Sequence, residues 1–240
     1  MITSVNNATI KELVKLKQKK YRDETGYYLV EGEHLVEEAI NAKQAIILIS
    51  TKEIKSDLEF LVVSEEVMKK IAFTKQPQSV MAKCKIVKKQ MLIETNRYLL
   101  LDSLQDPGNV GTLIRTALAF GVKQVILSPT WVDIYNDKVL RSMQGANFYI
   151  SCIYQKLEEV IPVLQNNNVY VVGSALENGT AIETIIPNQK MAYIVGNEGN
   201  GMRKEIMSIC DQLAYIPISN IESLNVAVAG SIMMYYFKEK

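Results

Sequence analysis

The chain has 240 residues, 48% of them hydrophobic, and a formal net charge of +1. This length is enough for one large domain or two modest ones, and the hydrophobic share is enough for a packed core. No apolar run reaches the roughly 18 residues that a membrane-spanning helix needs. The first residues also lack the apolar block of a secretory signal, so we expect a cytoplasmic protein.

The cysteines and the single histidine exclude several kinds of site. Cys84, Cys152 and Cys210 are far apart and form no CxxC pair, which argues against a zinc site and a disulfide framework and favours buried thiols. His34 is the only histidine, so no second one can share a metal ion with it. We therefore expect neither a metal centre nor a catalytic triad built on histidine.

The basic residues are concentrated near the amino terminus, although the whole chain is nearly neutral. Near neutrality argues against a nucleic-acid partner, whereas a basic segment argues for one. Within the first 22 residues only Glu12 opposes Lys11, Lys15, Lys17, Lys19, Lys20 and Arg22. This segment is either a contact for RNA phosphates or a solvated helix face.

Residues 1–94 are predicted to form a small α/β domain. Helices are expected over 9–20, 33–42 and 64–73, and strands at 27–30, 45–50, 59–64 and 83–89. The polar segment 94–96 that follows fits a linker to a second domain.

Residues 95–240 are predicted to form a larger α/β domain. Apolar runs at successive positions are typical of strands that are buried on both faces of a mainly parallel sheet, with helices on both faces. The expected strands are 98–102, 124–128, 169–175, 192–196 and 213–218. The expected helices lie near 111–120, 136–144, 156–165, 201–210 and 223–237. In such a fold the site lies at the carboxyl ends of the strands.

The first loop of interest follows the strand at 98–102. It contains a turn at 106–108, and Gly111 allows close approach of the backbone. Arg115 falls about one turn inside the following helix, where a guanidinium can bind a phosphate. No Lys-Ser/Thr pair follows the glycines, so this is not a Walker loop.

The second loop carries Gly196, Gly199 and Gly201 in the order GxxGxG. A nicotinamide-dependent oxidoreductase would show GxGxxG at this place, so that alternative lacks its fingerprint. A tight turn would explain the glycines alone, but Asn197 and Glu198 add polar groups that a merely structural turn does not need.

The third loop precedes the last apolar helix. The strand before it ends at Pro217, and Ser223-Leu224-Asn225 opens the helix. Ser223 is suited to cap this helix, and a functional role is the alternative.

Together the three segments resemble the SpoU or TrmH-like RNA ribose methyltransferases of the SPOUT superfamily in residues, order and spacing. The segment at 132–146 and residues 3–42 also resemble the family and its accessory substrate-binding domain, so the likeness covers nearly the whole chain. The matching motif positions are Asn109, Gly111 and Arg115, then 196–199, then 223–225.

The resemblance implies an enzyme that transfers a methyl group from S-adenosylmethionine to a ribose 2′-hydroxyl of structured RNA, with rRNA favoured over tRNA. It also implies a homodimer and a trefoil knot near the carboxyl terminus, which general topology rules would not predict. Residues 1–94 would bind the RNA substrate, and residues 95–240 would form the knotted methyltransferase domain.

The resemblance further implies which residues form the site. The expected catalytic set is Asn109, Arg115, Glu198, Ser223 and Asn225. The methyl donor is expected to bind largely through backbone groups at Ala175, Gly196, Ile216, Ile218 and Leu224.

Each catalytic residue has an expected role. The family's candidate for activating the hydroxyl is Arg115, but a guanidinium keeps its proton. We therefore expect Arg115 to hold an RNA phosphate and stabilise the developing alkoxide, while the phosphate or water accepts the proton. Asn109 would orient the ribose or Arg115, Glu198 would organise its loop or contact RNA, and Ser223 with Asn225 would close the site.

One stretch departs from the family pattern. Residues 219–222 stand where the family commonly has a glycine, and the stretch is one residue shorter. Asn220 can supply a left-handed conformation there, because asparagine tolerates it better than most residues. The shortened stretch leaves an alternative function open, that of an RNA-binding ribosome-assembly factor that keeps the fold without methyl transfer.

Overall fold

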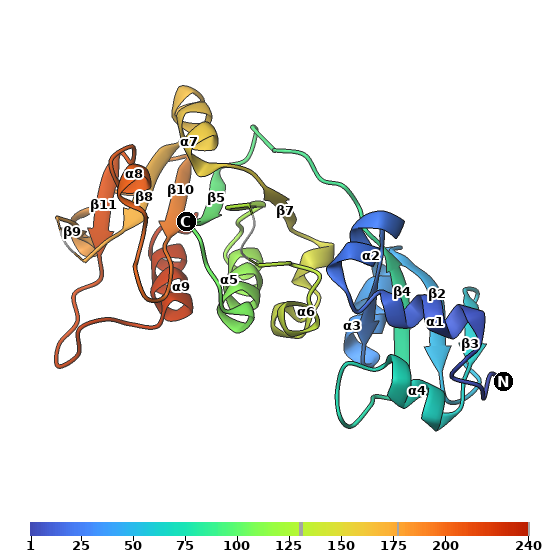
Figure 1. The fold of residues 1–240 in the computed structure, drawn as a ribbon. Helices are drawn as coiled ribbons and strands as arrows, with labels where there is room; N and C mark the ends of the chain where they lie inside the picture. Colours follow the sequence, from blue (N-terminus) through green and yellow to red (C-terminus); the bar gives the residue numbers. More distant parts are fainter. Residues whose placement is uncertain (130–131, 177, 240) are drawn as a thin grey trace. The chain divides into compact units, whose positions relative to one another are not determined.

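The computed structural model describes residues 1–129, 132–176 and 178–239, and the chain forms two compact units (Figure 1). The first unit comprises Met1–Lys88 and Asp133–Phe148, and the second comprises Lys89–Val132 and Tyr149–Lys240. The sequence-based division places the segment from 133 to 148 in the second domain. By its contacts it groups with the first unit, because helix α6 (Asp137–Met143) packs against strand β1 (Tyr27–Glu31).

The first unit is built on a four-stranded sheet in the order β1-β4-β2-β3. β2 and β3 pair in parallel, and the other two pairs are antiparallel. The remaining strands are β2 (Ala45–Ser50), β3 (Glu59–Val62) and β4 (Val80–Lys85). The helices are α1 (Ala8–Lys15), α2 (Lys19–Thr25), α3 (Glu33–Asn41) and α4 (Glu65–Ile71), besides α6 and a short 3-10 turn, η1 (Ala146–Phe148).

Apolar side chains fix how the helices of this unit pack. Ile10 and Leu13 share one face of α1, and they form a buried cluster with α4 and the sheet. Helix α3 packs on β1, β2 and β4 through its own buried stripe. The prediction of one helix over 9–20 is wrong, because the backbone becomes extended at Gln18 (φ −100°, ψ 134°), which separates α1 from α2. Leu16, which lies between the two helices, is buried in the same cluster.

The second unit is built on a seven-stranded sheet in the order β7-β6-β5-β10-β8-β11-β9, and every described pair is parallel. Its strands are β5 (Arg97–Leu101), β6 (Gln124–Leu127), β7 (Ser151–Tyr154), β8 (Tyr170–Ser174), β9 (Thr180–Ala181), β10 (Met191–Val195) and β11 (Gln212–Tyr215). Its helices are α5 (Pro107–Ala119), α7 (Leu157–Asn166), α8 (Lys204–Met207) and α9 (Val226–Tyr236), with the 3-10 turn η2 (Ile182–Thr184). The predicted fold class, α/β with a mainly parallel sheet, is confirmed.

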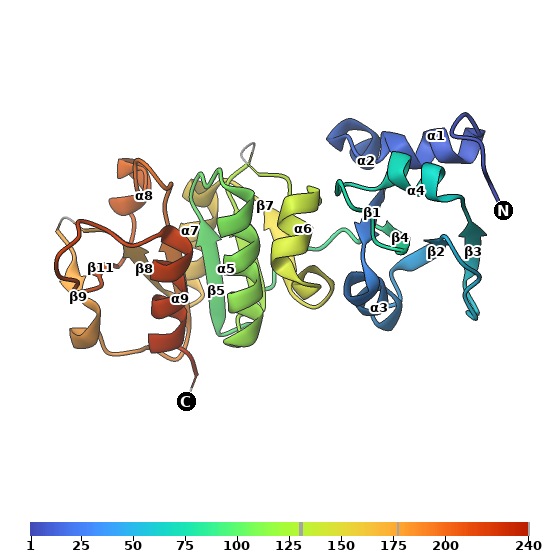
Figure 2. The same ribbon diagram turned by 90° about the horizontal axis from the view of Figure 1, so that it is seen from below.

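Helices lie on both faces of this sheet. α5 and α9 pack together on one face, and α7 with α8 lies on the other (Figure 2). Every residue of β5, β6 and β10 is buried, which is why these strands are continuous apolar runs in the sequence. Gly230 of α9 is needed for the close packing, because a Cβ atom there would lie 2.5 Å from the side chain of Leu113 on α5.

Two strands of the sheet were not predicted. β7 and β9 are its two edge strands, and their residues are half-buried or exposed, so they lack a continuous apolar run. The helix expected over 201–210 is reduced to the four residues of α8. No helix among the described residues has the length and apolar character that crossing a membrane requires.

Candidate functional site

The three loops of interest follow strands β5, β10 and β11. All strands of the sheet run parallel, so these loops emerge at the same edge, formed by the carboxyl ends of the strands. Segments that lie about a hundred residues apart in the sequence are thereby brought together. Side-chain hydrogen bonds connect all three loops.

The loop after β10 has a closed backbone geometry. The N–H groups of Asn197 and Gly201 each donate to the carbonyl of the other, at 2.9 Å. The side-chain oxygen of Asn197 accepts from the N–H groups of Gly199 (3.0 Å) and Asn200 (3.2 Å). A Cβ atom on Gly196 would lie 2.2 Å from the backbone of Gly201, so only glycine fits at 196.

Glu198 projects from this loop to the loop after β5. Its carboxylate accepts hydrogen bonds from the backbone N–H groups of Gln105 (3.3 Å) and Asp106 (3.1 Å), and from the side-chain amide of Asn109 (3.2 Å). Burial opposes the charged form, but these hydrogen bonds and one from its own backbone outweigh it, so the pKa of Glu198 lies below its ordinary value. Of its two predicted roles, organising the loop has this direct structural support.

Asn109 connects all three motifs. Its amide nitrogen donates to Glu198, and its amide oxygen accepts from the side chain of Asn225 at 3.1 Å. It lies in the first turn of α5, which Asp106 caps by accepting from the N–H of Asn109 at 2.8 Å. The structure therefore brings Asn109, Glu198 and Asn225 together, as the motif spacing predicts.

Arg115 lies more than two turns inside α5, and not about one turn as predicted, because the helix already begins at Pro107. Its side chain is exposed. Among the described residues it forms no hydrogen bond and no ion pair. In particular, Asn109 does not orient it directly, because the described side-chain hydrogen bonds of Asn109 go to Glu198 and Asn225. Its guanidinium is thus available for an external anion.

The third loop differs from the prediction at the start of its helix. Asn225, and not Ser223, caps α9, because the Asn225 side chain accepts from the N–H groups of Ala227 (2.9 Å) and Val228 (3.3 Å). Ser223 is exposed two residues before the cap, with no hydrogen bond to any described residue. Asn220 adopts a left-handed conformation with φ +69°, so this part of the prediction is confirmed.

The predicted donor positions lie at the same edge of the sheet. Ile216, Ile218 and Leu224 are half-buried, and within the described structure the backbone of 216–224 forms no hydrogen bond. Free N–H and C=O groups beside half-buried apolar side chains suit the planar base and polar edge of a nucleoside such as that of S-adenosylmethionine. Ala175 is already engaged, because its N–H donates to the carbonyl of Ala214 at 2.9 Å.

Two residues outside the three motifs, Asp102 and Arg203, hold the loop after β10 in place. The carboxylate of Asp102, at the end of β5, accepts from the backbone N–H of Arg203 (2.8 Å) and from its Nε (2.7 Å). Asp102 has no exposed surface, and this ion pair closes the far end of the loop after β10. An acidic residue directly after a buried apolar run was the available signal.

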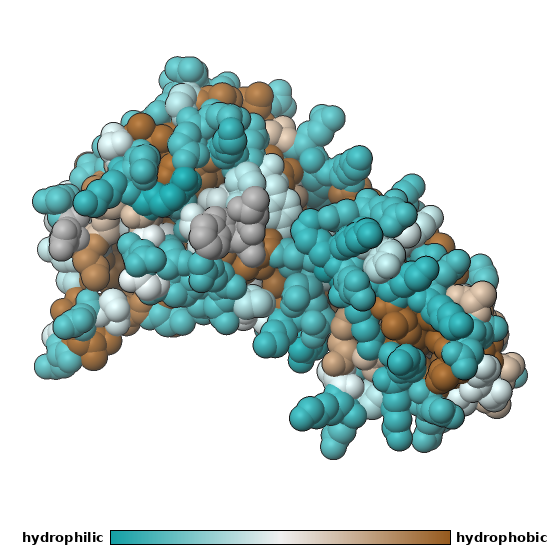
Figure 3. Space-filling view, viewed as in Figure 1, coloured by the Kyte–Doolittle hydropathy of each residue, from teal (hydrophilic) through white to brown (hydrophobic). Residues whose placement is uncertain are grey.

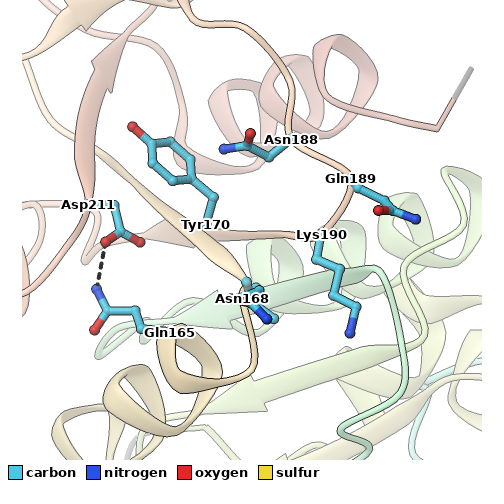
Figure 4. A pocket seen from close by; sticks show the side chains of 8 residues that line it. Gln165, Asn168, Tyr170, Asn188, Gln189, Lys190 and Asp211 are labelled. Atoms are coloured by element: carbon cyan, nitrogen blue, oxygen red, sulfur yellow. Dashed lines mark hydrogen bonds between the residues drawn. The ribbon is translucent and has the colours of Figure 1, made fainter.

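A cavity of about 500 Å³ lies elsewhere on the second unit, at the amino ends of β8 and β10 (Figure 4). Polar side chains dominate its lining, and Asp211 accepts a hydrogen bond from Gln165 there at 3.0 Å. None of the predicted site residues lines it. Its residues are Gln165, Asn168, Val169, Tyr170, Asn188, Gln189, Lys190 and Asp211.

The basic segment of the first unit is only partly available to a partner. Arg22 is 5% exposed, forms an ion pair with Asp133 and donates to the carbonyl of Leu16. Lys17 donates to the carbonyls of Lys70 (3.0 Å) and Ala72 (2.6 Å). These two cations therefore stabilise the fold, whereas the other four lie exposed: Lys11, Lys15, Lys19 and Lys20.

The fold and the site define a ligand-binding α/β protein whose polar loops meet at the carboxyl edge of a parallel sheet. Comparison with known proteins narrows this class. Residues 96–235 match the model of the SpoU rRNA Methylase family, and residues 7–82 match that of the MRM3-like substrate binding domain.

Individual relatives extend along nearly the whole chain. The chain is 38% identical to the Bacillus subtilis 23S rRNA (guanosine(2553)-2′-O)-methyltransferase RlmP, over 99% of this chain and 98% of the relative. A crystal structure of an AdoMet-bound rRNA methyltransferase from Sinorhizobium meliloti is 30% identical with a TM-score of 0.88, covering 98% of this chain and 95% of that one. A putative TrmH-family RNA methyltransferase from Porphyromonas gingivalis is 28% identical with a TM-score of 0.87, covering 98% and 99%.

The chain belongs to the SpoU rRNA methylase family. The predicted family, the predicted enzyme class of RNA 2′-O-methyltransferase and the predicted use of S-adenosylmethionine are confirmed.

Proposed function

We propose that this methyltransferase acts on the ribose 2′-hydroxyl of a guanosine in 23S rRNA. The observation that carries this substrate is the 38% identity to the Bacillus subtilis enzyme RlmP along nearly the full length of both chains. A ribosomal substrate also supports a cytoplasmic location, which the lack of an apolar signal block in the first residues predicts.

The methyl donor is proposed to bind at the carboxyl edge of the sheet, between the loops after β10 and β11. S-adenosylmethionine supplies an electrophilic methyl group on its sulfonium. Gly196, with no side chain, and the free backbone groups of Ile216, Ile218 and Leu224 would bind it, and Ala175 would contribute through its carbonyl. Ser223 and Asn225 would close the site beside them. The hydrogen bonds among Asn109, Glu198 and Asn225 support this arrangement because they hold the loops before any ligand arrives.

Arg115 is proposed to hold a phosphate of the RNA and to stabilise the ribose oxygen as its proton leaves. Its exposed guanidinium has no partner among the described residues, and five N–H donors suit a phosphate. The proton passes to the phosphate or to water, because arginine stays charged. Glu198 and Asn109 would fix the geometry of the loops after β5 and β10.

The first unit is proposed to bind the RNA. Hydrophilic residues cover most of its face drawn in Figure 3. The Nζ atoms of the exposed Lys15 and Lys20 lie 5.5 and 5.7 Å from the ring centre of the half-buried Tyr21, so two cations and an aromatic ring form one patch. Such a patch suits phosphates and stacked bases of structured RNA.

A homodimer is also proposed. Val228, Ile232 and Tyr235 lie on one face of α9 and are 48%, 36% and 58% exposed. Their spacing of four and three residues makes a continuous apolar stripe, which a second copy of the chain would cover.

The carboxyl-terminal segment is proposed to be knotted. β11 is inserted between β8 and β9, both of which precede it in the chain, and α9 then packs back on β10 and α5. A chain that returns between earlier segments in this way supports the knot that the family resemblance implies.

The test is a calorimetric titration with S-adenosylmethionine, followed by tritiated methyl transfer to 23S rRNA that lacks ribose methylation. We expect binding, and label in nuclease-resistant dinucleotides that contain guanosine. Label in another nucleotide or in tRNA would overturn the proposed substrate. Binding of RNA without binding of the donor would favour a ribosome-assembly factor instead.

The role of the first unit is tested separately. Replacing Lys15 and Lys20 by alanine should weaken RNA binding. It should also lower the slope of the logarithm of the RNA-binding constant against the logarithm of the salt concentration, by about 0.7 to 0.9 for each lost phosphate contact. Affinity for the donor should stay unchanged. Truncation of residues 1–22 is a poorer test, because it also removes the buried Arg22 and its ion pair with Asp133.

A further inference from the structure

The loop from 196 to 203 is attached at both ends to two consecutive residues that follow β5. At its start, the side-chain amide of Asn197 donates to the carbonyl of Ser103 at 2.9 Å. At its end, Arg203 donates two hydrogen bonds to the carboxylate of Asp102, at 2.8 and 2.7 Å. Both ends of the loop are therefore held by the segment that directly follows β5, an inner strand of the sheet.

Asp102 is an unusual anchor because it is a fully buried carboxylate. The hydroxyls of Ser103 (3.2 Å) and Ser128 (3.4 Å) lie within hydrogen-bonding distance, but Arg203 supplies the only positive charge paired with it among the described residues. A buried charge without its partner is strongly unfavourable. Release of Arg203 would leave this charge uncompensated, so the loop is held in one conformation.

Arg203 has a second, outer partner. Its NH1 donates to Glu158 at 2.5 Å, but the side chains of Arg203 and Glu158 are 39% and 42% exposed. Water and salt weaken such an exposed pair, whereas the pair with buried Asp102 is protected from both. The two ion pairs of Arg203 thus differ in strength. A variant that removes only the weaker, outer pair therefore serves as a control for loss of the inner pair.

The anchored loop is the one that forms the donor site. Gly196 packs directly against the backbone of Gly201 and Met202, and Met202 adjoins Arg203. A shift of Arg203 therefore moves the backbone against which Gly196 is packed. Since a binding loop that is ordered beforehand spares the ligand the cost of ordering it, anchoring favours affinity.

We propose that Asp102 and Arg203 are positioning residues for the methyl donor, which act through the loop and touch neither substrate. This inference rests on the proposed donor site. Loss of the ion pair would loosen Gly196 and its loop, and so weaken donor binding more than the chemical step or RNA binding.

The test compares the full-length variant Arg203→Met with the wild type. Met keeps the backbone N–H bond to Asp102 and removes the charge. We expect the Kd for S-adenosylmethionine to rise roughly ten- to hundredfold, as for loss of a hydrogen bond to a charged group. The kcat at saturating donor and the Kd for RNA should stay within about twofold of the wild type, the size of a change of a few tenths of a kcal/mol.

Two further variants keep the test decisive where Arg203→Met does not fold. Arg203→Lys restores the positive charge but not the planar guanidinium that contacts both Asp102 and Glu158. Its Kd for the donor should lie between those of the wild type and Arg203→Met. Glu158→Gln removes only the outer pair, and should leave the Kd of the wild type unchanged.

A purely structural role gives a different pattern. In that case Arg203→Met and Arg203→Lys would have lower melting temperatures and fewer binding sites per chain, but would bind the donor with the Kd of the wild type. This result would overturn the inference and leave the proposed function intact. Absence of donor binding by the wild type would overturn the proposed function, and the inference with it.

Discussion

The two edges of the seven-stranded sheet differ in what they offer a ligand. The carboxyl edge has side chains from three loops that bind one another, such as Asn109 with Glu198 and Asn225. The amino edge has the cavity of about 500 Å³, whose mostly polar lining contains no residue of the three motifs. We therefore assign the proposed donor site from the converging hydrogen bonds and free backbone groups of the carboxyl edge, and not from the volume of the cavity.

The comparison is tested most strongly by two cations, Arg115 on helix α5, which begins at the carboxyl edge, and Lys190 at the cavity. Arg115→Ala should lower kcat about 100- to 1000-fold, the loss typical of removing one group that stabilises a developing oxyanion. Lys190→Ala at the cavity should leave kcat unchanged. Methyl transfer under saturating donor and RNA measures both. A loss of donor binding by Arg115→Ala would indicate a structural arginine instead.

Two glycines within the donor loop sharpen the comparison further. Gly196→Ala places a Cβ atom 2.2 Å from the backbone of Gly201, whereas a Cβ atom on Gly199 meets only the Asn197 side chain, at 3.7 Å. Overpacking costs about 1–3 kcal/mol, so Gly196→Ala should weaken donor binding roughly 5- to 150-fold. Gly199→Ala should change it little. Equal calorimetric Kd values for the two variants would contradict the assigned loop geometry.

One asparagine from each edge gives a smaller contrast. Asn109→Ala removes the amide that joins Glu198 to Asn225, and two hydrogen bonds of about 1 kcal/mol each correspond to a loss of roughly 30-fold in kcat/KM. Asn188→Ala removes an amide from the cavity and should have no effect. A matching loss in Asn188→Ala would show that the amino edge contributes to the reaction.

The smallest expected effect is the pH dependence of the stability that Glu198 contributes. Hydrogen bonds outweigh burial and depress the pKa of Glu198 in the folded chain. The ionised carboxylate therefore stabilises the fold at a pH above the pKa of an unfolded glutamate, about 4.3. This contribution to stability is lost as the pH falls through the lower pKa of the folded chain. The melting temperature of Glu198→Gln should therefore lie below that of the wild type at pH 7, and the gap should narrow below about pH 4.3. The exposed Glu183→Gln controls for the loss of one charge. A gap that widens with acid would contradict the assigned contacts of Glu198.

Much of the fold could be predicted because the buried strands carry their own signal. β5 and β10 are apolar at nearly every position, and the central strands of the sheet were found at nearly their observed positions. The edge strands β7 and β9 could not be found, because half-buried positions carry no continuous apolar run. The break between the first two helices lies at the extended residue Gln18, and local periodicity, which continues to about residue 20, does not reveal it.

The site could be predicted where short motifs carry it. Asn109, Glu198 and Asn225 stand in recognisable motifs, and the structure brings them together. Asp102 and Arg203 could not be paired from sequence, because about a hundred residues separate them and only the adjacency of β5 and β10 unites them. Likewise, the sequence counts Arg22 among the surface cations, and only the fold shows its buried partner Asp133.

The central claim is that the methyl donor binds at the carboxyl edge of the sheet. Hydrogen–deuterium exchange with and without S-adenosylmethionine tests it most directly, because the backbone amides of 216–224 have no hydrogen-bond partner among the described residues. We expect the donor to slow exchange in 196–203 and 216–224 and to leave 165–170 and 188–190 unchanged. Protection of the cavity segments, with none in the two loops, would contradict the account.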